Sequence, residues 1–126
     1  MRLKRNRLME CCHREALPQK DSEGGSYIIY GEEKHSFKAE MWPAGGKLQS
    51  EMYGIRLPNV RNLRLDGAYK EVHGSRKKVG FQVTQGGITF QVTVNDGICL
   101  YSDDEPDYKV VAIYPYSHLI LEVEKL

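Results

Sequence analysis

The amino-acid sequence predicts a mainly β domain, built as a small antiparallel barrel or sandwich with long loops and at most one or two short helices. Three observations lead to this prediction. Apolar and polar residues alternate from Ile88 to Val94, which is the period of a strand with one buried face. Residues 108–114 and 118–123 are rich in β-branched and aromatic residues. Turn-forming residues separate these runs, as expected for strands that fold back on one another.

The first half of the chain is less regular and predicts shorter strands. Phe37, Ala39 and Met41 recur at every second position, as expected when one face of a strand is buried. A helix of one or two turns is predicted at residues 47–53, because Gly54 is a favourable residue for ending a helix. The strands expected in this half lie at residues 9–16, where a helix is the alternative, and at residues 27–30, 35–42 and 62–65.

Turns and loops divide the second half. Asp96-Gly97 predicts a tight turn after the strand at 88–94, because this dipeptide tolerates the positive φ that hairpin turns need. A short strand is expected at residues 98–101, followed by an acidic loop that contains Pro106. Residues 68–87 fit no single element and are interpreted as a loop or a weak hairpin inserted into the domain.

Length and composition exclude several classes of protein. The chain has 126 residues, with 18 Lys and Arg against 17 Asp and Glu, so its formal net charge is +1. This length fits a single domain over residues 1–126, and the neutrality provides no bulk attraction to nucleic acid or to anionic membranes. We expect neither a signal peptide nor a membrane helix, because every apolar run is short. Three cysteines without a secretion signal indicate reduced thiols in a cytoplasm.

The near-neutral total hides two segments of opposite charge. Residues 1–20, a basic N-terminal segment, contain six basic and two acidic residues, a net charge of +4. Residues 101–107 contain four acidic residues and no basic one. Each segment is interpreted either as a solvated, flexible stretch or as a patch that binds other copies or other proteins and sets their register. The candidate assembly residues are Arg2, Lys4, Arg5, Arg7, Asp103, Asp104, Glu105 and Asp107.

No sequence motif predicts catalysis. A glycine-rich phosphate-binding loop is missing, and the four histidines have no metal-ligand spacing. Cys11 and Cys12 precede His13 but lack the second ligand pair of a zinc site. Cys99 is expected to be a small buried hydrophobe, although a histidine close to it in space would make a nucleophile pair. We therefore predict no catalytic residue, cofactor or metal, and keep a small β-fold enzyme as an alternative.

The cluster Arg76, Lys77 and Lys78 is the candidate DNA-facing loop. Basic side chains attract phosphates in a salt-dependent way without reading sequence, and the eight tyrosines of the chain could stack on bases. The alternative interpretation of the cluster is a solvated hairpin tip. A small nucleic-acid-binding β module that uses these three residues is therefore a further candidate function.

Several short motifs, taken in order, resemble a known family. They are FKAEMWP at 37–43, GGKLQSEMYG at 45–54, DGICLY at 96–101, PDYKV at 106–110 and YPYSHLILEVE at 114–124. Their order and the chain length resemble the small head–tail connector proteins of tailed phages, also called head-closure or stopper proteins. This family includes the connector-type proteins of the defective prophage PBSX and of related phage-like elements. The resemblance covers about residues 20–126, with residues 68–87 as an insertion.

The resemblance implies a structural virion or prophage protein. Such subunits form a ring, commonly of about twelve copies, that joins the DNA-filled head to the tail below the portal and adaptor. The isolated subunit can be a monomer. The implied partners are other copies, a portal or adaptor protein, a tail-completion or tail protein, and DNA that passes through the channel without sequence specificity. No membrane is implied, and the protein would occupy the bacterial host cytoplasm during assembly and then the neck of the particle.

Overall fold

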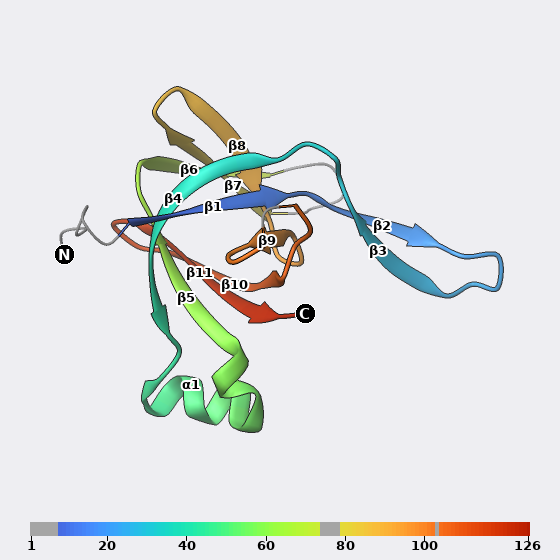
Figure 1. Ribbon diagram of the computed structural model, residues 1–126, viewed down its shortest axis with the longest axis horizontal. Helices are drawn as coiled ribbons and strands as arrows, with labels where there is room; N and C mark the ends of the chain where they lie inside the picture. The colour runs from blue at the N-terminus through green and yellow to red at the C-terminus, as the bar shows by residue number, and fades with distance from the viewer. Residues whose placement is uncertain (1–7, 74–78, 103) are drawn as a thin grey trace.

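The protein is a closed β-barrel with three attached elements (Figure 1). A computed structural model describes residues 8–73, 79–102 and 104–126. The barrel order is β1-β4-β5-β11-β10-β9, and each neighbouring pair is antiparallel. The barrel strands are β1 (Leu8–Arg14), β4 (His35–Pro43), β5 (Val60–Leu65), β9 (Gly97–Cys99), β10 (Tyr108–Pro115) and β11 (Leu119–Lys125). The predicted mainly β class is confirmed, and its barrel form is the one that the chain adopts.

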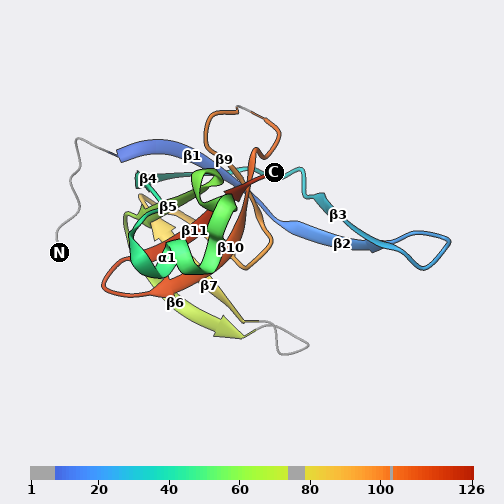
Figure 2. The same ribbon diagram turned by 90° about the horizontal axis from the view of Figure 1, so that it is seen from below.

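The attached elements differ in how closely they pack on the barrel. Strands β2 (Ala16–Lys20) and β3 (Ser26–Tyr30) form a hairpin that projects away from it in both views (Figures 1 and 2). Strands β6 (Ala68–His73), β7 (Val79–Gln85) and β8 (Ile88–Val92) form a three-stranded sheet. Helix α1 (Gly46–Tyr53) and the 3-10 helix η2 (Gly54–Asn59) connect β4 to β5. No helix within the described ranges is long and apolar enough to cross a membrane.

The helix predicted at residues 47–53 is confirmed, including its end at Gly54. The backbone φ of Gly54 is +55°, a positive value that glycine adopts without steric strain. The strand predicted at 9–16 is confirmed for β1, but the chain bends at Glu15 and a second strand, β2, starts at Ala16. Residues 68–87 contain β6, β7 and the turn that leads to β8.

The inward faces of the barrel strands form the core. Leu119, Leu121 and Val123 alternate along β11 and are at most 1% exposed, as the sequence pattern predicts. On β10, Val110 pairs with Val123 and Ile113 pairs with Leu121, because a bulge at Val111 shifts the register by one residue. Without this extra residue, Ile113 would point out of the barrel.

The three-stranded sheet completes the core from one side. Phe81, Val83, Phe90 and Val92 belong to the same buried cluster as the barrel side chains. The predicted apolar face of 88–94 is therefore correct for Phe90 and Val92 only. Ile88 and Val94 are 47% and 45% exposed, since Ile88 is the first residue of β8 after the turn at residues 86–87 and Val94 lies beyond the end of the strand at Val92.

Truncation of an inward residue of β11 tests this assignment of faces. The substitution Leu121→Ala is expected to lower the free energy of unfolding by about 2–5 kcal/mol, since it leaves a cavity in the core. The neighbouring substitution Ile120→Ala, on the outward face, is expected to cost less than half as much. Urea denaturation of both variants measures the difference, and equal losses would contradict the register given above.

Candidate functional site

The β2–β3 hairpin exposes large apolar side chains on both of its faces. Tyr27 and Ile29 lie on one face and Ile28 on the other, because successive strand residues point to opposite sides. These side chains, named here the hairpin surface, are 51%, 45% and 43% exposed, respectively. A continuous apolar run is typical of a strand that is covered on both faces, and an isolated two-stranded hairpin is at best marginally stable in water. The hairpin therefore has the features of a segment that a partner covers.

Helix α1 turns its apolar side away from the barrel. Leu48 and Met52 are one helical turn apart and therefore share one side of α1, and Ile55 follows near the start of η2. These side chains, named here the helix surface, are 70%, 49% and 98% exposed, and no residue of α1 or η2 is buried. A helix on a globular protein normally buries its apolar side, so this orientation leaves the helix surface available to a partner.

Polar contacts hold α1 and η2 against the barrel. The amide of Gln49 donates to Oδ1 of Asn62 at 2.8 Å, and the Tyr53 hydroxyl donates to the Glu122 carboxylate. Burial and this hydrogen bond both raise the pKa of Tyr53, so the hydroxyl keeps its proton and remains a donor. The apolar residues of α1 are therefore not needed to attach it to the barrel.

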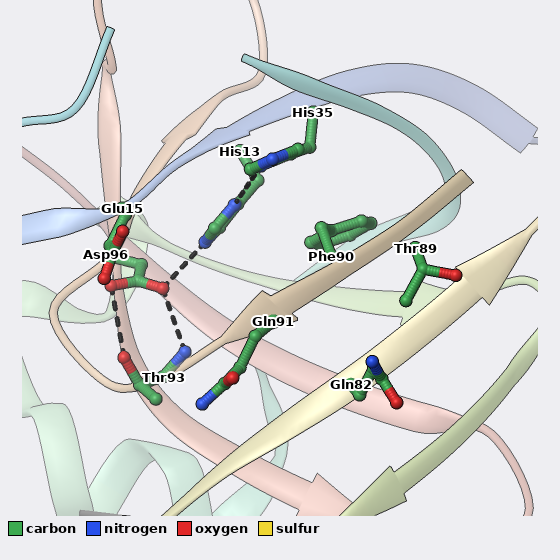
Figure 3. Close-up of a pocket in the computed structure, with 9 residues that line it drawn as sticks. All are labelled: His13, Glu15, His35, Gln82, Thr89, Phe90, Gln91, Thr93 and Asp96. Atoms are coloured by element: carbon green, nitrogen blue, oxygen red, sulfur yellow. Dashed lines mark hydrogen bonds and ion pairs between the residues drawn. The ribbon is translucent and has the colours of Figure 1, made fainter. Parts of the chain in front are cut away.

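The buried carboxylate of Asp96 contacts the root of the hairpin, and Figure 3 shows its contacts with His13 and Thr93. Its Oδ1 accepts a hydrogen bond from the backbone N–H of Ala16, the first residue of β2, at 3.0 Å. Its Oδ2 accepts from the N–H of Thr93 at 2.9 Å and lies 2.7 Å from Nε2 of His13. Asp96 and His13 are at most 1% exposed. One carboxylate thus joins β1, the start of β2 and the turn between β8 and β9.

A second histidine extends this buried pair toward the surface. Nδ1 of His13 lies 3.2 Å from Nδ1 of His35, and Nε2 of His35 lies 3.2 Å from Oε1 of Glu33. The contacts therefore form a chain from Asp96 through His13 and His35 to Glu33. Phe90 packs against both imidazoles, with ring centroids 5.1 and 5.5 Å away.

The histidine pair borders a cavity of about 380 Å³ between the barrel and the three-stranded sheet. Thr89, Gln82 and Gln91 line the rest of it with polar groups (Figure 3). In the described part of the chain, no group of three or more His, Cys, Asp or Glu residues is placed to hold a metal ion. Through its hydrogen bond with the N–H of Ala16, Asp96 connects this cluster to the hairpin root.

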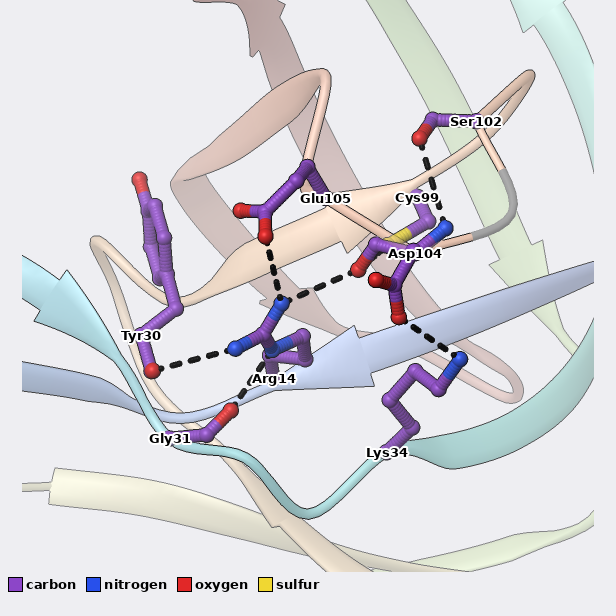
Figure 4. A network of polar contacts seen from close by, with 8 residues as sticks. All are labelled: Arg14, Tyr30, Gly31, Lys34, Cys99, Ser102, Asp104 and Glu105. Atoms are coloured by element: carbon purple, nitrogen blue, oxygen red, sulfur yellow. Dashed lines mark hydrogen bonds and ion pairs between the residues drawn. The ribbon is translucent and has the colours of Figure 1, made fainter.

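Arg14 makes a second attachment at the same root (Figure 4). Its Nε donates to the carbonyl of Gly31 at 2.6 Å, and its Nη2 donates to the carbonyl of Tyr30 at 3.2 Å. Its Nη1 donates to the carbonyl of Asp104 at 3.0 Å and lies 3.7 Å from Oε1 of Glu105. Arg14 therefore binds the end of the hairpin and the acidic loop to β1.

The acidic loop makes further contacts within the chain. Lys34 donates to Asp104 at 3.0 Å, and this hydrogen bond and the ammonium charge lower the pKa of the Asp104 carboxyl. Asp107 accepts from the backbone N–H groups of Leu100 and Tyr101 at 2.8 and 3.0 Å. The carboxylates of Asp104 and Asp107 therefore help to hold the loop in place.

The structure describes only some of the predicted site residues. Arg14, in the basic N-terminal segment, contacts the acidic loop within the chain, so the two segments meet at this residue. Of the candidate assembly residues, Arg2, Lys4, Arg5, Arg7 and Asp103 lie outside the described residues, as do the DNA-facing candidates Arg76, Lys77 and Lys78. The hairpin and helix surfaces were not predicted, although the unbroken run Tyr27–Tyr30 is a pattern of two-sided burial.

The three cysteines are free thiols, and two of them are buried. Burial raises the pKa of the Cys11 thiol to about 12, and burial also raises the pKa of Cys99. Cys99 lies opposite Cys12 in the β1–β9 pair, and its Sγ donates to the carbonyl of Asp104 at 3.7 Å. Because the thiolate is the nucleophilic form, the raised pKa values make Cys11 and Cys99 poor nucleophiles.

Comparison of the chain with protein-family models, with curated proteins and with solved structures finds no match. The fold and the contacts above therefore carry the functional argument. The described residues form a small β-barrel that carries the hairpin surface and the helix surface on separate elements. Asp96 and Arg14 attach the hairpin to the barrel.

Removal of the Asp96 carboxylate tests its role at the root. The substitution Asp96→Ala is expected to lower the free energy of unfolding by about 3–5 kcal/mol, because it leaves His13 and two backbone N–H groups buried without their acceptor. The exposed Glu23→Ala, in the hairpin turn, is the control and is expected to change it by less than about 0.5 kcal/mol. Urea unfolding measures both, and similar small effects would rule out the proposed role.

The raised pKa of Cys11 predicts a loss of stability in alkali. The folded chain holds the thiol proton up to about pH 12, whereas the unfolded chain releases it near the ordinary pKa of 9.0. The stabilisation from this thiol is complete below pH 9 and falls as the pH rises toward 12. Between pH 8 and pH 10, wild type is expected to lose about 1 kcal/mol more than Cys11→Ala, measured by urea unfolding. Equal losses in the two proteins would contradict the assignment.

Proposed function

We propose that the chain is a structural subunit of the neck of a tailed-phage or prophage particle. In this role it joins the DNA-filled head to the tail, as a ring subunit below the portal and adaptor. The observation that supports assembly is the pair of exposed apolar surfaces, which lie on different elements of one barrel. The order of sequence motifs that resembles the head-closure family supports the phage assignment.

A ring of identical subunits needs two different surfaces that fit each other. Each subunit in such a ring contacts one neighbour with one surface and the other neighbour with another. The hairpin and helix surfaces are two such surfaces on a barrel whose closure leaves no open sheet edge. The barrel supplies a rigid scaffold, and the attached elements supply the contacts to other copies, the adaptor and the tail protein.

The DNA-facing role of Arg76, Lys77 and Lys78 is kept as part of this proposal. In the sequence they follow β6, which ends at His73, and precede β7, which begins at Val79. Basic residues at that position suit sequence-independent contact with DNA in a channel. Loss of DNA from particles that carry alanine at all three positions would support the role, and normal DNA retention would contradict it.

Deletion of the gene in the bacterium that encodes the chain tests the proposed function. After induction of the phage-like element, electron microscopy is expected to show filled or leaking heads separated from free tails. The wild-type gene supplied in trans should restore joined particles, and mass spectrometry should detect the chain in them. Joined particles in normal numbers without the chain would refute the proposal.

A further inference from the structure

We propose that the hairpin surface of one copy binds the helix surface of the next copy, so that the chain assembles head to tail. The inference rests on the proposed function and specifies which two surfaces of the subunit meet. The two surfaces lie at separate places on the barrel: the hairpin projects sideways, whereas α1 lies below the barrel in Figure 1. The two surfaces of one copy therefore do not cover each other, so a contact between a hairpin surface and a helix surface joins two copies.

The shapes of the two surfaces suit this contact. The hairpin is a narrow projection with apolar side chains, and the helix surface consists of exposed apolar residues on α1 and η2. A contact between hairpins alone would leave Leu48, Met52 and Ile55 in water. A contact between helices alone would leave Tyr27, Ile28 and Ile29 in water. The head-to-tail contact covers both sets in every copy with a single kind of interface, and burial of apolar area is the main favourable term in association.

The charges around the two surfaces also favour the head-to-tail contact. Residues 15–34, which contain the hairpin, have five acidic and two basic residues, a net charge of −3. Residues 46–61, which contain the helix surface, have a net charge of +2, and the contacts of Glu122 with Tyr53 and of Glu124 with Arg56 bring this region to neutrality. Two hairpins would repel each other, whereas a neutral helix surface does not repel a hairpin, which favours this pairing.

The hairpin is held ready for such a contact. Asp96 and Arg14 fix its two strands at the root, through Ala16 on β2 and Tyr30 on β3. At the far end, Oδ1 of Asp21 accepts from the N–H groups of Glu23 and Gly25 at 2.9 and 2.7 Å and orders the turn. A segment that is ordered before binding loses less conformational entropy when it binds.

A mixing experiment tests the contact. The hairpin variant Ile29→Glu keeps an intact helix surface, and the helix variant, Leu48→Glu with Ile55→Glu, keeps an intact hairpin. Analytical ultracentrifugation over a concentration series should show wild type associating beyond a dimer, with each variant weakened on the order of tenfold or more. An equimolar mixture of the two variants should form a dimer and stop there, because only one intact contact remains. Ile88→Glu, an equally exposed apolar residue on β8, is the matched control and should behave as wild type.

A photo-crosslinking phenylalanine analogue at position 28, in place of Ile28, gives a second measurement in the otherwise wild-type chain. Crosslinks to an isotopically labelled second copy are expected within residues 46–59, and circular dichroism confirms that each altered chain is folded. Crosslinks that join hairpin to hairpin, a mixture that stays monomeric, or wild type that never associates would each overturn the inference. None of these outcomes would affect the deletion experiment, so failure of the contact and failure of the proposed function can be told apart.

Discussion

The buried carboxylate of Asp96 is the constraint on which the arrangement of this protein depends. Its side chain accepts hydrogen bonds from His13, Ala16 and Thr93, and its carbonyl accepts from the N–H of Val110 at 2.9 Å. A buried charge is tolerated only where hydrogen bonds replace the lost water, so these donors must all be in place. The same residue therefore sets the path of β1 and β10 and the direction in which the hairpin leaves the barrel.

The buried core of the barrel and the exposed apolar side chains lie on different elements of the molecule. The barrel buries the inward residues of its six strands and leaves no strand edge unpaired. The large apolar side chains of the hairpin and of α1 do not contribute to that core. Exposed apolar patches are normally kept small on a monomer, so two of them on attached elements indicate surfaces for binding.

Some charged residues of the acidic loop form ion pairs and hydrogen bonds within the chain. Arg14 and Lys34 bind Asp104 and Glu105 within the chain, which ties the loop to the hairpin root. Exposed ion pairs of this kind contribute at most about 1 kcal/mol each, so they orient the loop more than they stabilise the fold. The apolar surfaces, and not these charges, supply the main attraction in the proposed assembly.

The sequence by itself determined the strand faces and the helix, because both depend on local periodicity. The alternation at Leu119, Leu121 and Val123 and the stop at Gly54 can be read without any partner strand. Only the tertiary structure decided that His13 meets His35, 22 residues away, and Asp96, 83 residues away. Period-two patterning shows which face a residue occupies but not which strand lies beside it. Barrel closure supplies that neighbour, and the polar contacts of Gln49 and Tyr53 with the barrel leave Leu48 and Met52 of α1 exposed.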